Sequence, residues 1–387
     1  MNIVFTEPYR NQLLPFTYTK PVSELRCGIL KMREKWEKLF PEARVSHNTE
    51  QYLQDTRWPL NLEKDNYFIN ASVFPNHNLV KEIKNLQPKD ALFHNNILLA
   101  YRSADFEKIE RKIEIDDEPM MLKNTWYIFA LNHKAIEMDF ELITEGRQSE
   151  NIPEHVLAIN PDRIFIEPGA KLINGTLNAT DGPIYIGKDS EVMESSNIRG
   201  PFALCEHATV KMGAKIYTGT TIGPHSKVGG EVSNSVIQGY SNKGHDGFLG
   251  NSVIGEWCNL GADTNTSNLK NNYASVKLWD YEKEGFKDTG LQFCGLMMGD
   301  HSKCGINTMF NTGTVVGVSA NIYGSGFPRN FIPSFSWGGS SGFITYKFSK
   351  ATEVAKVVMK RRDIDFNEKD EAILNQVFEL TQKFRKR

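Results

Sequence analysis

A segment with a dense polar motif, residues 242–269, holds the residue types that could do chemistry. His245 stands between Gly244 and Asp246, and the amides Asn259 and Asn268 follow it in the same segment. A histidine titrates near neutral pH, so it can take up or release a proton without a large shift of its pKa. An amide can accept a hydrogen bond from one hydroxyl and donate one to another, which suits a sugar. These residues could therefore transfer a proton on a hydroxylated ligand, although a solvated histidine in a turn is the alternative.

An internal repeat with a period of six residues surrounds this segment. Every sixth residue is apolar in one unbroken run, and the period then resumes in two shorter runs: Ile186, Val192, Ile198, Leu204, Val210, Ile216, Ile222, Val228; Phe248, Ile254, Leu260; and Met298, Cys304, Phe310, Val316, Ile322. This period fits neither a helix nor an alternating strand. It predicts a β-solenoid in which three hexapeptides close one triangular coil, with one apolar side chain per hexapeptide pointing to the axis. From about residue 164 to 322 there is room for roughly seven coils. A β-sandwich with fortuitous spacing is the alternative.

Two further segments do not follow the repeat. Residues 270–293 break the period and are rich in charged and aromatic residues; so long a loop in a solenoid is usually functional or disordered, and its place after the polar segment favours a function. From about Lys347 the chain predicts two helices, at about 349–361 and after the N-cap residue Asn367. The first helix has Val354, Val357 and Val358 on one side, and we expect the second to bury Ile373, Val377, Leu380 and Phe384. They could form a lid over the open end of the solenoid or take part in ligand binding.

The composition excludes several classes of protein. The chain has 387 residues, of which 40% are hydrophobic and 24% charged, as expected for a globular protein of two or three domains. Its 45 basic and 47 acidic residues give no electrostatic reason to expect nucleic acid or a membrane surface as a partner. The five cysteines have no CxxC spacing, so neither a disulfide framework nor a cysteine zinc site is implied. With no signal-like start and no long apolar run, we expect a reduced, cytoplasmic protein.

The motifs around His245 resemble those of the left-handed β-helix (hexapeptide-repeat) acyltransferases. The closest resemblance is to the acetyltransferase half of the bifunctional N-acetylglucosamine-1-phosphate uridyltransferase/glucosamine-1-phosphate acetyltransferase family. It rests on Gly244-His245, Leu249-Gly250-Asn251, residues 259–264 (Asn-Leu-Gly-Ala-Asp-Thr) and Asn268-Leu269. The resemblance extends from about residue 160 to 325 and implies a left-handed parallel β-helix.

The resemblance also implies roles for single residues. His245 matches the catalytic base, which takes a proton from the acceptor as its amine or hydroxyl adds to the thioester of acetyl-CoA or another acyl-CoA. Asn259 and Asn268 match asparagines that bind the sugar acceptor and orient the base. Phe248 replaces a tyrosine that contacts the substrate phosphate, and Lys243 could supply phosphate affinity one residue away from the position of the family's lysine. The acceptor implied is a sugar or sugar phosphate.

The same family implies a homotrimer in which acyl-CoA lies in the groove between adjacent β-helices. Small residues that would let the pantetheine arm approach are Gly317, Ser319 and Ala320, and Arg329 could meet the phosphates. Solenoid turns also require small residues, so Gly317, Ser319 and Ala320 could instead serve only the fold.

The first part of the chain resembles a sugar nucleotidyltransferase domain, which implies a reduced Rossmann-like α/β fold. The resemblance rests on a first strand at residues 2–5 and on the motif of residues 14–26, LPFTYTKPVSELR. Arg10 and Lys20 would contact a nucleotide or sugar phosphate. Residues 7–9 (Glu-Pro-Tyr) stand where the family has its glycine-rich phosphate loop, and Ala71 stands where it has a metal-binding aspartate. We therefore expect a degenerate domain without a metal site, which would use Mg²⁺ only if it is active.

The change in composition near residue 155 predicts three parts. These are a nucleotidyltransferase-like domain at 1–155, a β-helix at 156–342 with the inserted loop 270–293, and a helical extension at 343–387. The function expected first is acyl-CoA-dependent transfer of an acyl group to a sugar or sugar phosphate. The alternatives are an active sugar-1-phosphate nucleotidyltransferase whose β-helix serves as a trimerisation scaffold, and a ligand-sensing protein without catalysis.

Overall fold

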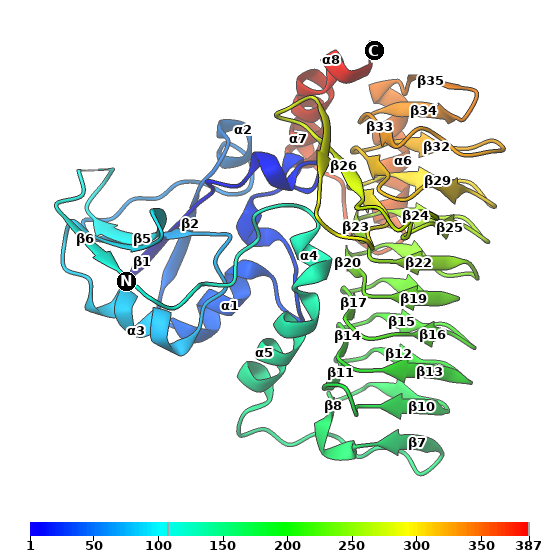
Figure 1. Cartoon of the computed structure of the whole chain (residues 1–387), viewed down its shortest axis with the longest axis horizontal. Coiled ribbons are helices and arrows are strands. Elements are labelled where there is room, and N and C mark those ends of the chain that lie inside the picture. Colours follow the sequence, from blue (N-terminus) through cyan, green and yellow to red (C-terminus); the bar gives the residue numbers. More distant parts are fainter. Residues whose placement is uncertain (107, 386–387) are drawn as a thin grey trace. The chain divides into compact units, whose positions relative to one another are not determined.

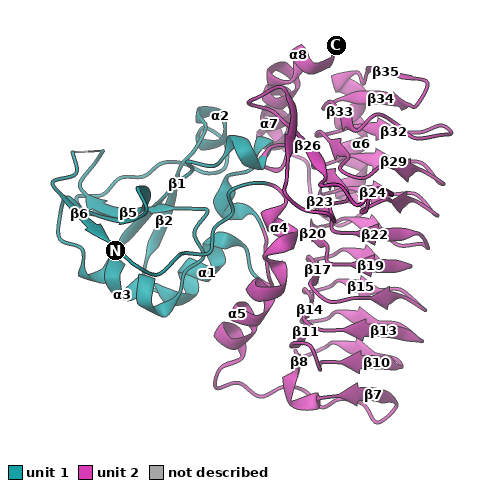
Figure 2. Ribbon diagram, viewed as in Figure 1, with its two compact units in different colours: residues 1–13, 17–25, 30–124 teal, residues 14–16, 26–29, 125–387 magenta. Residues whose placement is uncertain are grey.

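The computed structural model describes residues 1–106 and 108–385 and divides them into two compact units (Figure 2). Unit 1 contains residues 1–13, 17–25 and 30–124, and unit 2 contains residues 14–16, 26–29 and 125–387. None of the helices in the described part of the chain is long and apolar enough to cross a membrane.

Unit 1 is built on a six-stranded mixed sheet with the strand order β2-β1-β3-β5-β4-β6. Its strands are β1 Asn2–Thr6, β2 Arg44–Asn48, β3 Asn66–Asn70, β4 Asp90–His94, β5 Ile97–Ser103 and β6 Arg111–Glu114, and its helices are α1 Met32–Leu39, α2 Gln51–Gln54 and α3 His77–Asn85. The central strand β1 runs parallel to both β2 and β3. All residues of β3 and β4 are buried, as in a sheet whose two faces are both covered. The expected α/β fold of the first part is confirmed.

Unit 2 is a left-handed parallel β-helix made of three sheets, each with one short strand per coil (Figure 1). The first sheet holds β7 Val156–Ile159, β10 Gly175–Asn178, β13 Ser196–Arg199, β16 Lys215–Ile216, β19 Glu231–Ser233 and β22 Phe248–Gly250, and is continued by the pair β25 Asn265–Thr266 and β30 Met309–Phe310. The second holds β8 Ile164–Ile166, β11 Ile184–Ile186, β14 Phe202–Leu204, β17 Thr220–Ile222, β20 Val236–Gly239, β23 Val253–Glu256, β28 Met297–Met298, β31 Val315–Val316 and β33 Phe331–Ile332. The third holds β9 Lys171–Leu172, β12 Glu191–Val192, β15 Thr209–Val210, β18 Lys227–Val228, β21 Asn242–Lys243, β24 Asn259–Leu260, β29 Lys303–Cys304, β32 Asn321–Ile322, β34 Ser336–Gly339 and β35 Gly342–Thr345.

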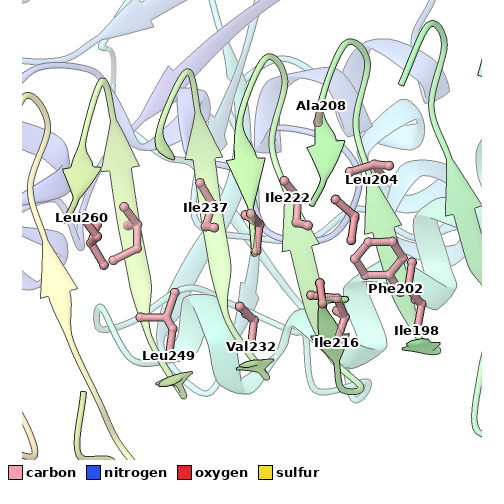
Figure 3. Packing of buried hydrophobic residues seen from close by; sticks show 14 of the residues in the cluster. Ile198, Phe202, Leu204, Ala208, Ile216, Ile222, Val232, Ile237, Leu249 and Leu260 are labelled. Carbon is pink, nitrogen blue, oxygen red and sulfur yellow. The ribbon is translucent and has the colours of Figure 1, made fainter. Parts of the chain in front are cut away.

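The side chains of the six-residue repeat form the core of this β-helix. In the second sheet Ile186, Leu204 and Ile222 are direct register partners, and all three are fully buried. Figure 3 shows such side chains stacked between successive coils. The repeat is therefore confirmed as the source of the fold, except at Phe248. There the next residue, Leu249, pairs with Val232 and is buried, so Phe248 lies at an outward position. The second sheet has nine strands rather than the roughly seven coils expected, because the solenoid continues beyond Ile322 to β33 and β34.

The corner before the third sheet carries a ladder of aromatic rings. His207, His225, Tyr240, Trp257 and His301 all have positive φ angles of 53–62°. The first four rings stack at centroid distances of 4.7, 4.9 and 4.3 Å, and His301 follows Trp257 at 6.3 Å. The three histidines are thus turn residues, as expected, but they are stacked against their neighbours.

The inserted loop folds as an antiparallel hairpin between β26 Lys277–Asp280 and β27 Gly285–Asp288. The loop leaves the β-helix after β25 and returns to it before β28. Strand β28 still pairs with β23 in parallel register. At the end of the β-helix, β35 pairs antiparallel with β34 and covers its edge.

The remaining helices of unit 2 are α4 Tyr127–Ala130, α5 Asn132–Thr144, α6 Phe348–Lys360, α7 Glu368–Leu380 and α8 Gln382–Arg385. Asn367 caps α7 as predicted, since its side chain accepts hydrogen bonds from the backbone N–H groups of Lys369 and Asp370. Leu380, which was expected inside, is 44% exposed, and Val357 on the apolar side of α6 is 60% exposed. The helices bury Ala351, Ala355, Met359 and Leu374 in addition to Ile373, Val377 and Phe384. The packed face of α6 is therefore made mainly of small residues.

Candidate functional site

His245 and Asn259 line one cavity of about 900 Å³, which we call the His245 cavity. His245 lies in the turn that joins β21 to β22, and Asn259 lies on β24, next to β21 in the third sheet. The half-buried Val354 and Val358 of α6 form an apolar part of the lining. Two of the residues predicted from the motif are thus brought together by neighbouring coils.

The imidazole of His245 is exposed to solvent, and no side chain or carbonyl of the described residues forms a hydrogen bond with it. Its turn is instead held through the backbone. The Lys243 Nζ atom donates hydrogen bonds to the His245 carbonyl at 2.7 Å and to the Gly229 carbonyl at 3.0 Å. The ring therefore has both nitrogens available for a ligand, while the position of its backbone is fixed.

Lys243 occupies an inward position of the β-helix. Its register partner on β18 is Val228, one of the apolar residues of the repeat, and Lys243 itself is only 3% exposed. Burial lowers its pKa to about 8, against a partial counteracting effect of Asp246. Its amine is directed to carbonyl groups of two turns, so the structure places Lys243 inside the coil and not in the lining of the His245 cavity.

Five basic residues line the His245 cavity, and the lining contains no aspartate or glutamate: Lys211, Lys227, Lys303, Arg361 and Arg362. Within the described part of the chain none of the five forms an ion pair. Burial lowers the pKa values of Lys227, Lys303 and Arg362. The charge of Arg362 lowers the pKa of Lys227 further, and the charge of Arg361 lowers the pKa of Arg362 further. A set of cations that repel one another around a partly desolvated space favours an anionic ligand.

These cations were not recognised from the sequence, although a signal for them exists. Lys227 and Lys303 each directly precede a residue of the apolar repeat, Val228 and Cys304. A strand residue next to an inward residue points outward, so both lysines had to lie on the outer face of the third sheet. The contribution of α6 depends on how that helix packs and could not be read from spacing.

Asn268 and Phe248 form a second group, outside the lining of the His245 cavity. The Asn268 Nδ2 atom donates a hydrogen bond to Asn251 Oδ1 at 2.8 Å. A Cβ atom on Gly250 would lie 2.5 Å from Cζ of Phe248 and 2.6 Å from Nδ2 of Asn268. Gly250 is therefore the residue that lets these two side chains pack together.

Of the four residues predicted for the acyl-CoA groove, three are buried in the last coils. Gly317, Ser319 and Ala320 belong to the interior, with Ser319 3% and Ala320 1% exposed. A Cβ atom on Gly317 would lie 2.3 Å from the Ser334 backbone nitrogen, so this glycine is required by coil stacking. Arg329 is exposed and lines a different cavity, near the inserted hairpin.

In unit 1 the guanidinium of Arg10 already has protein partners. It donates hydrogen bonds to the Thr17 carbonyl at 2.7 Å and to the Tyr52 hydroxyl at 2.9 Å. Lys20 is 5% exposed, and Ala71 is buried, with its N–H group donating to the Thr6 carbonyl.

Glu7 stands at the start of the loop that would bind phosphate. It accepts hydrogen bonds from Val22 N–H and from the Thr49 hydroxyl, both at 2.5 Å, and burial raises its pKa to about 7. A carboxylate that receives two donors occupies them much as a bound anion would. No group of three or more histidine, cysteine, aspartate or glutamate residues that could hold a metal occurs among residues 1–106 and 108–385.

Comparisons with known proteins support both resemblances. Residues 2–148 match the family model described as sugar nucleotidyl transferase. Among relatives, the chain is 34% identical over 118 residues to the bifunctional protein GlmU of Methanocaldococcus jannaschii, covering 30% of this chain and 26% of the relative. It is 29% identical over 166 residues to a bifunctional sugar-1-phosphate nucleotidylyltransferase/acetyltransferase of Sulfurisphaera tokodaii, covering 38% of this chain and 41% of that protein. The chain thus spans less than half the length of these two relatives.

One solved structure is similar to part of the chain. The crystal structure of the polySia-specific acetyltransferase NeuO is covered in full by 53% of this chain, with 15% sequence identity and a TM-score of 0.28.

Replacing Lys243 with methionine should separate stability from activity. The pKa of Lys243 is about 8 in the folded protein and near 10.5 when exposed, so the folded state binds its proton less tightly than the unfolded state does. The stability lost by burying the charge is therefore complete below pH 8 and recovered as the pH rises from 8 to 10.5. We expect Lys243→Met to raise the melting temperature more at pH 7 than at pH 10. Turnover should fall about tenfold, because the His245 turn loses the hydrogen bond that Lys243 donates to its backbone carbonyl.

Thermal melts at the two pH values check this expectation, with Lys215→Met, which removes an exposed lysine of β16, as the matched control. A Lys243→Met protein whose melting temperature differs from wild type equally at pH 7 and pH 10 would contradict it.

Proposed function

We propose that unit 2 transfers an acyl group from acetyl-CoA or another acyl-CoA to a sugar or sugar phosphate, with His245 as general base. The observation that carries the proposal is the His245 cavity. It brings His245 and Asn259 together with five basic residues and no carboxylate in its lining.

The chemistry follows from the groups present. An unpartnered imidazole nitrogen of His245 accepts the proton of the acceptor's amine or hydroxyl as that atom attacks the thioester carbonyl. The tetrahedral intermediate then collapses, the C–S bond breaks and the CoA thiolate leaves, taking up the proton that His245 holds. Asn259 is exposed on β24 beside the histidine and can bind a sugar hydroxyl as donor and acceptor.

The basic residues select a substrate that carries phosphate. Arginine and lysine bind phosphate oxygens through charge-assisted hydrogen bonds, and Arg361 and Arg362 are adjacent at the end of α6. Both acyl-CoA and a sugar phosphate bear such groups. Asn268 and Phe248, which lie on another part of the solenoid, would contact the acceptor only if a second copy of the chain brought them to the cavity.

A trimer would provide that second copy. The first sheet of the β-helix presents Leu157 and Tyr217, which are 61% and 45% exposed, and Phe248 lies at an outward position of its last strand. Apolar residues exposed on a regular sheet favour packing against another copy of the same sheet.

An active nucleotidyltransferase is the second candidate, and the match of residues 2–148 to the sugar nucleotidyl transferase model favours it. Two observations argue for a degenerate domain. The guanidinium of Arg10 is already bound to protein groups, and the carboxylate of Glu7 already accepts the Val22 N–H group, so neither the guanidinium nor this N–H group is free to bind phosphate. We propose acyl transfer first for that reason, and place the protein in the cytoplasm, where acyl-CoA is available.

His245→Ala should lower turnover by about 10² to 10⁴ and leave acyl-CoA affinity nearly unchanged, because the base acts on the acceptor's proton and not on the donor. Asn259→Ala should raise the KM for the acceptor instead. The measurement is thiol release from acetyl-CoA with a panel of amino sugars and sugar phosphates. His133→Ala, in α5, is the matched control. Undiminished thiol release by His245→Ala would end the assignment of the base.

Light scattering should give the mass of three chains, about 132 kDa from 43.9 kDa each. Tyr217→Glu should shift the mass toward one chain, because it places a charge on the apolar sheet. Tyr273→Glu, at a 65% exposed tyrosine of the insertion, should not. A wild-type monomer at micromolar concentration would remove the second copy from the site.

Pyrophosphate release from nucleoside triphosphates and sugar 1-phosphates should be absent and should not respond to Mg²⁺. The reason is that Ala71 offers no carboxylate at the position where the family has its metal-binding aspartate. Rapid Mg²⁺-dependent release in this assay would favour the second candidate.

A further inference from the structure

A second cavity, of about 640 Å³, lies between the inserted hairpin, β33 and α8. We call it the hairpin cavity. It shares no lining residue with the His245 cavity and has the volume of a small-molecule site. The segments that build it, residues 270–293 and the C-terminal helix, contribute no residue to the lining of the His245 cavity.

One side of the hairpin cavity is a set of aromatic rings in fixed orientations. Trp279 stacks on Phe331 with a centroid distance of 4.1 Å and an interplanar angle of 9°. Phe286 and Phe384 meet Trp279 edge-on, at 82° and 90°. Phe286 is 50% exposed, so one more flat ring could stack against it.

The indole nitrogen of Trp279 is buried and has no acceptor among the described residues. Because this atom has almost no accessible surface, a ligand in the cavity would contact the aromatic rings and not the N–H group. The aromatic side of the cavity therefore suits a planar ring.

The other side of the cavity is basic. Lys270, Lys277 and Arg329 line it, and the lining contains no acidic residue. Lys270 donates to the Ser275 carbonyl, and Lys277 is the cross-strand partner of Asp288, whereas Arg329 forms no ion pair in the described chain and lies 5.8 Å from the ring of Phe343. Three cations in a lining without a carboxylate favour a ligand that carries phosphate.

We infer that the hairpin cavity binds a nucleoside phosphate, with the base stacked against Phe286 and the phosphates on Lys270, Lys277 and Arg329. Stacking combined with phosphate contacts fits a nucleoside phosphate better than a sugar phosphate, which lacks the planar ring. Such a ligand could be the nucleotide half of acyl-CoA or the nucleoside diphosphate of a nucleotide sugar. The inference stands on the hairpin cavity alone and does not require acyl transfer at His245.

Isothermal titration of the full-length protein, without Mg²⁺, tests this inference with three probes: adenosine 3′,5′-bisphosphate, UDP and inorganic pyrophosphate. We expect one of the two nucleotides to bind at least tenfold more tightly than pyrophosphate. A preference for the adenosine bisphosphate identifies the acyl-CoA source, and a preference for UDP identifies the nucleotide sugar. Equal affinity for pyrophosphate, or no binding of either nucleotide, would overturn the inference.

Two variants locate the binding. Phe286→Ala and Arg329→Gln should each weaken the preferred nucleotide by about fivefold to a hundredfold. Phe327→Ala, which removes a 51% exposed phenylalanine outside the cavity, and Arg44→Gln in unit 1 should leave its affinity unchanged. Melting temperatures of all four variants show that they are folded. Undiminished binding in folded Phe286→Ala and Arg329→Gln would show that the nucleotide binds elsewhere, whatever His245→Ala does to thiol release.

Discussion

The backbone pairing of each coil with the next is the constraint on which the rest of unit 2 depends. Parallel strands of successive coils lie about 4.8 Å apart, and their register places chemically related residues in columns. Lys227, Asn242, Asn259 and Lys303 form one such column of direct register partners on the third sheet. All four line the His245 cavity because of this pairing, since each belongs to a different coil and none is a sequence neighbour of another. A displacement of one coil by a single residue would turn the column inward.

The same constraint makes departures from the repeat informative. An inward position normally holds an apolar residue, and a charged group there lowers stability unless its hydrogen bonds are satisfied. Lys243 takes such a position in line with Val228, and its amine bonds to the carbonyls of two successive turns. The turn beyond it carries His245. Lys243 is unfavourable for the core but holds the backbone of the exposed His245. Its presence is therefore better explained by a role in the functional site than by a role in the fold.

The fold could be predicted from the sequence because the repeat is a local and redundant signal. Each coil repeats an apolar residue at every sixth position, so Ile186, Leu204 and Ile222 identify the core even where other positions differ. Placement of side chains at the corners could not be predicted in this way. Ser319 and Ala320 read as small surface residues, yet they are buried, since exposure at a corner depends on what packs over the final coils. The exposure of Val357 has the same origin: spacing shows that α6 is a helix but not which face its partner covers.

A solenoid can also gain a site without losing its register, because each coil contacts only its two neighbours. Residues 270–293 leave the β-helix after β25 and return before β28, while Val253 and Ile254 still pair with Met297 and Met298. The insertion thus contributes Trp279 and Phe286 to the hairpin cavity with little effect on the core below it. Sequence reasoning found the insertion because it breaks the period, but the cavity depends on Phe331 and Phe384, which are far along the chain. The two cavities therefore represent two ways of building a site on this fold: outward columns that the register aligns, and an inserted hairpin that the register tolerates.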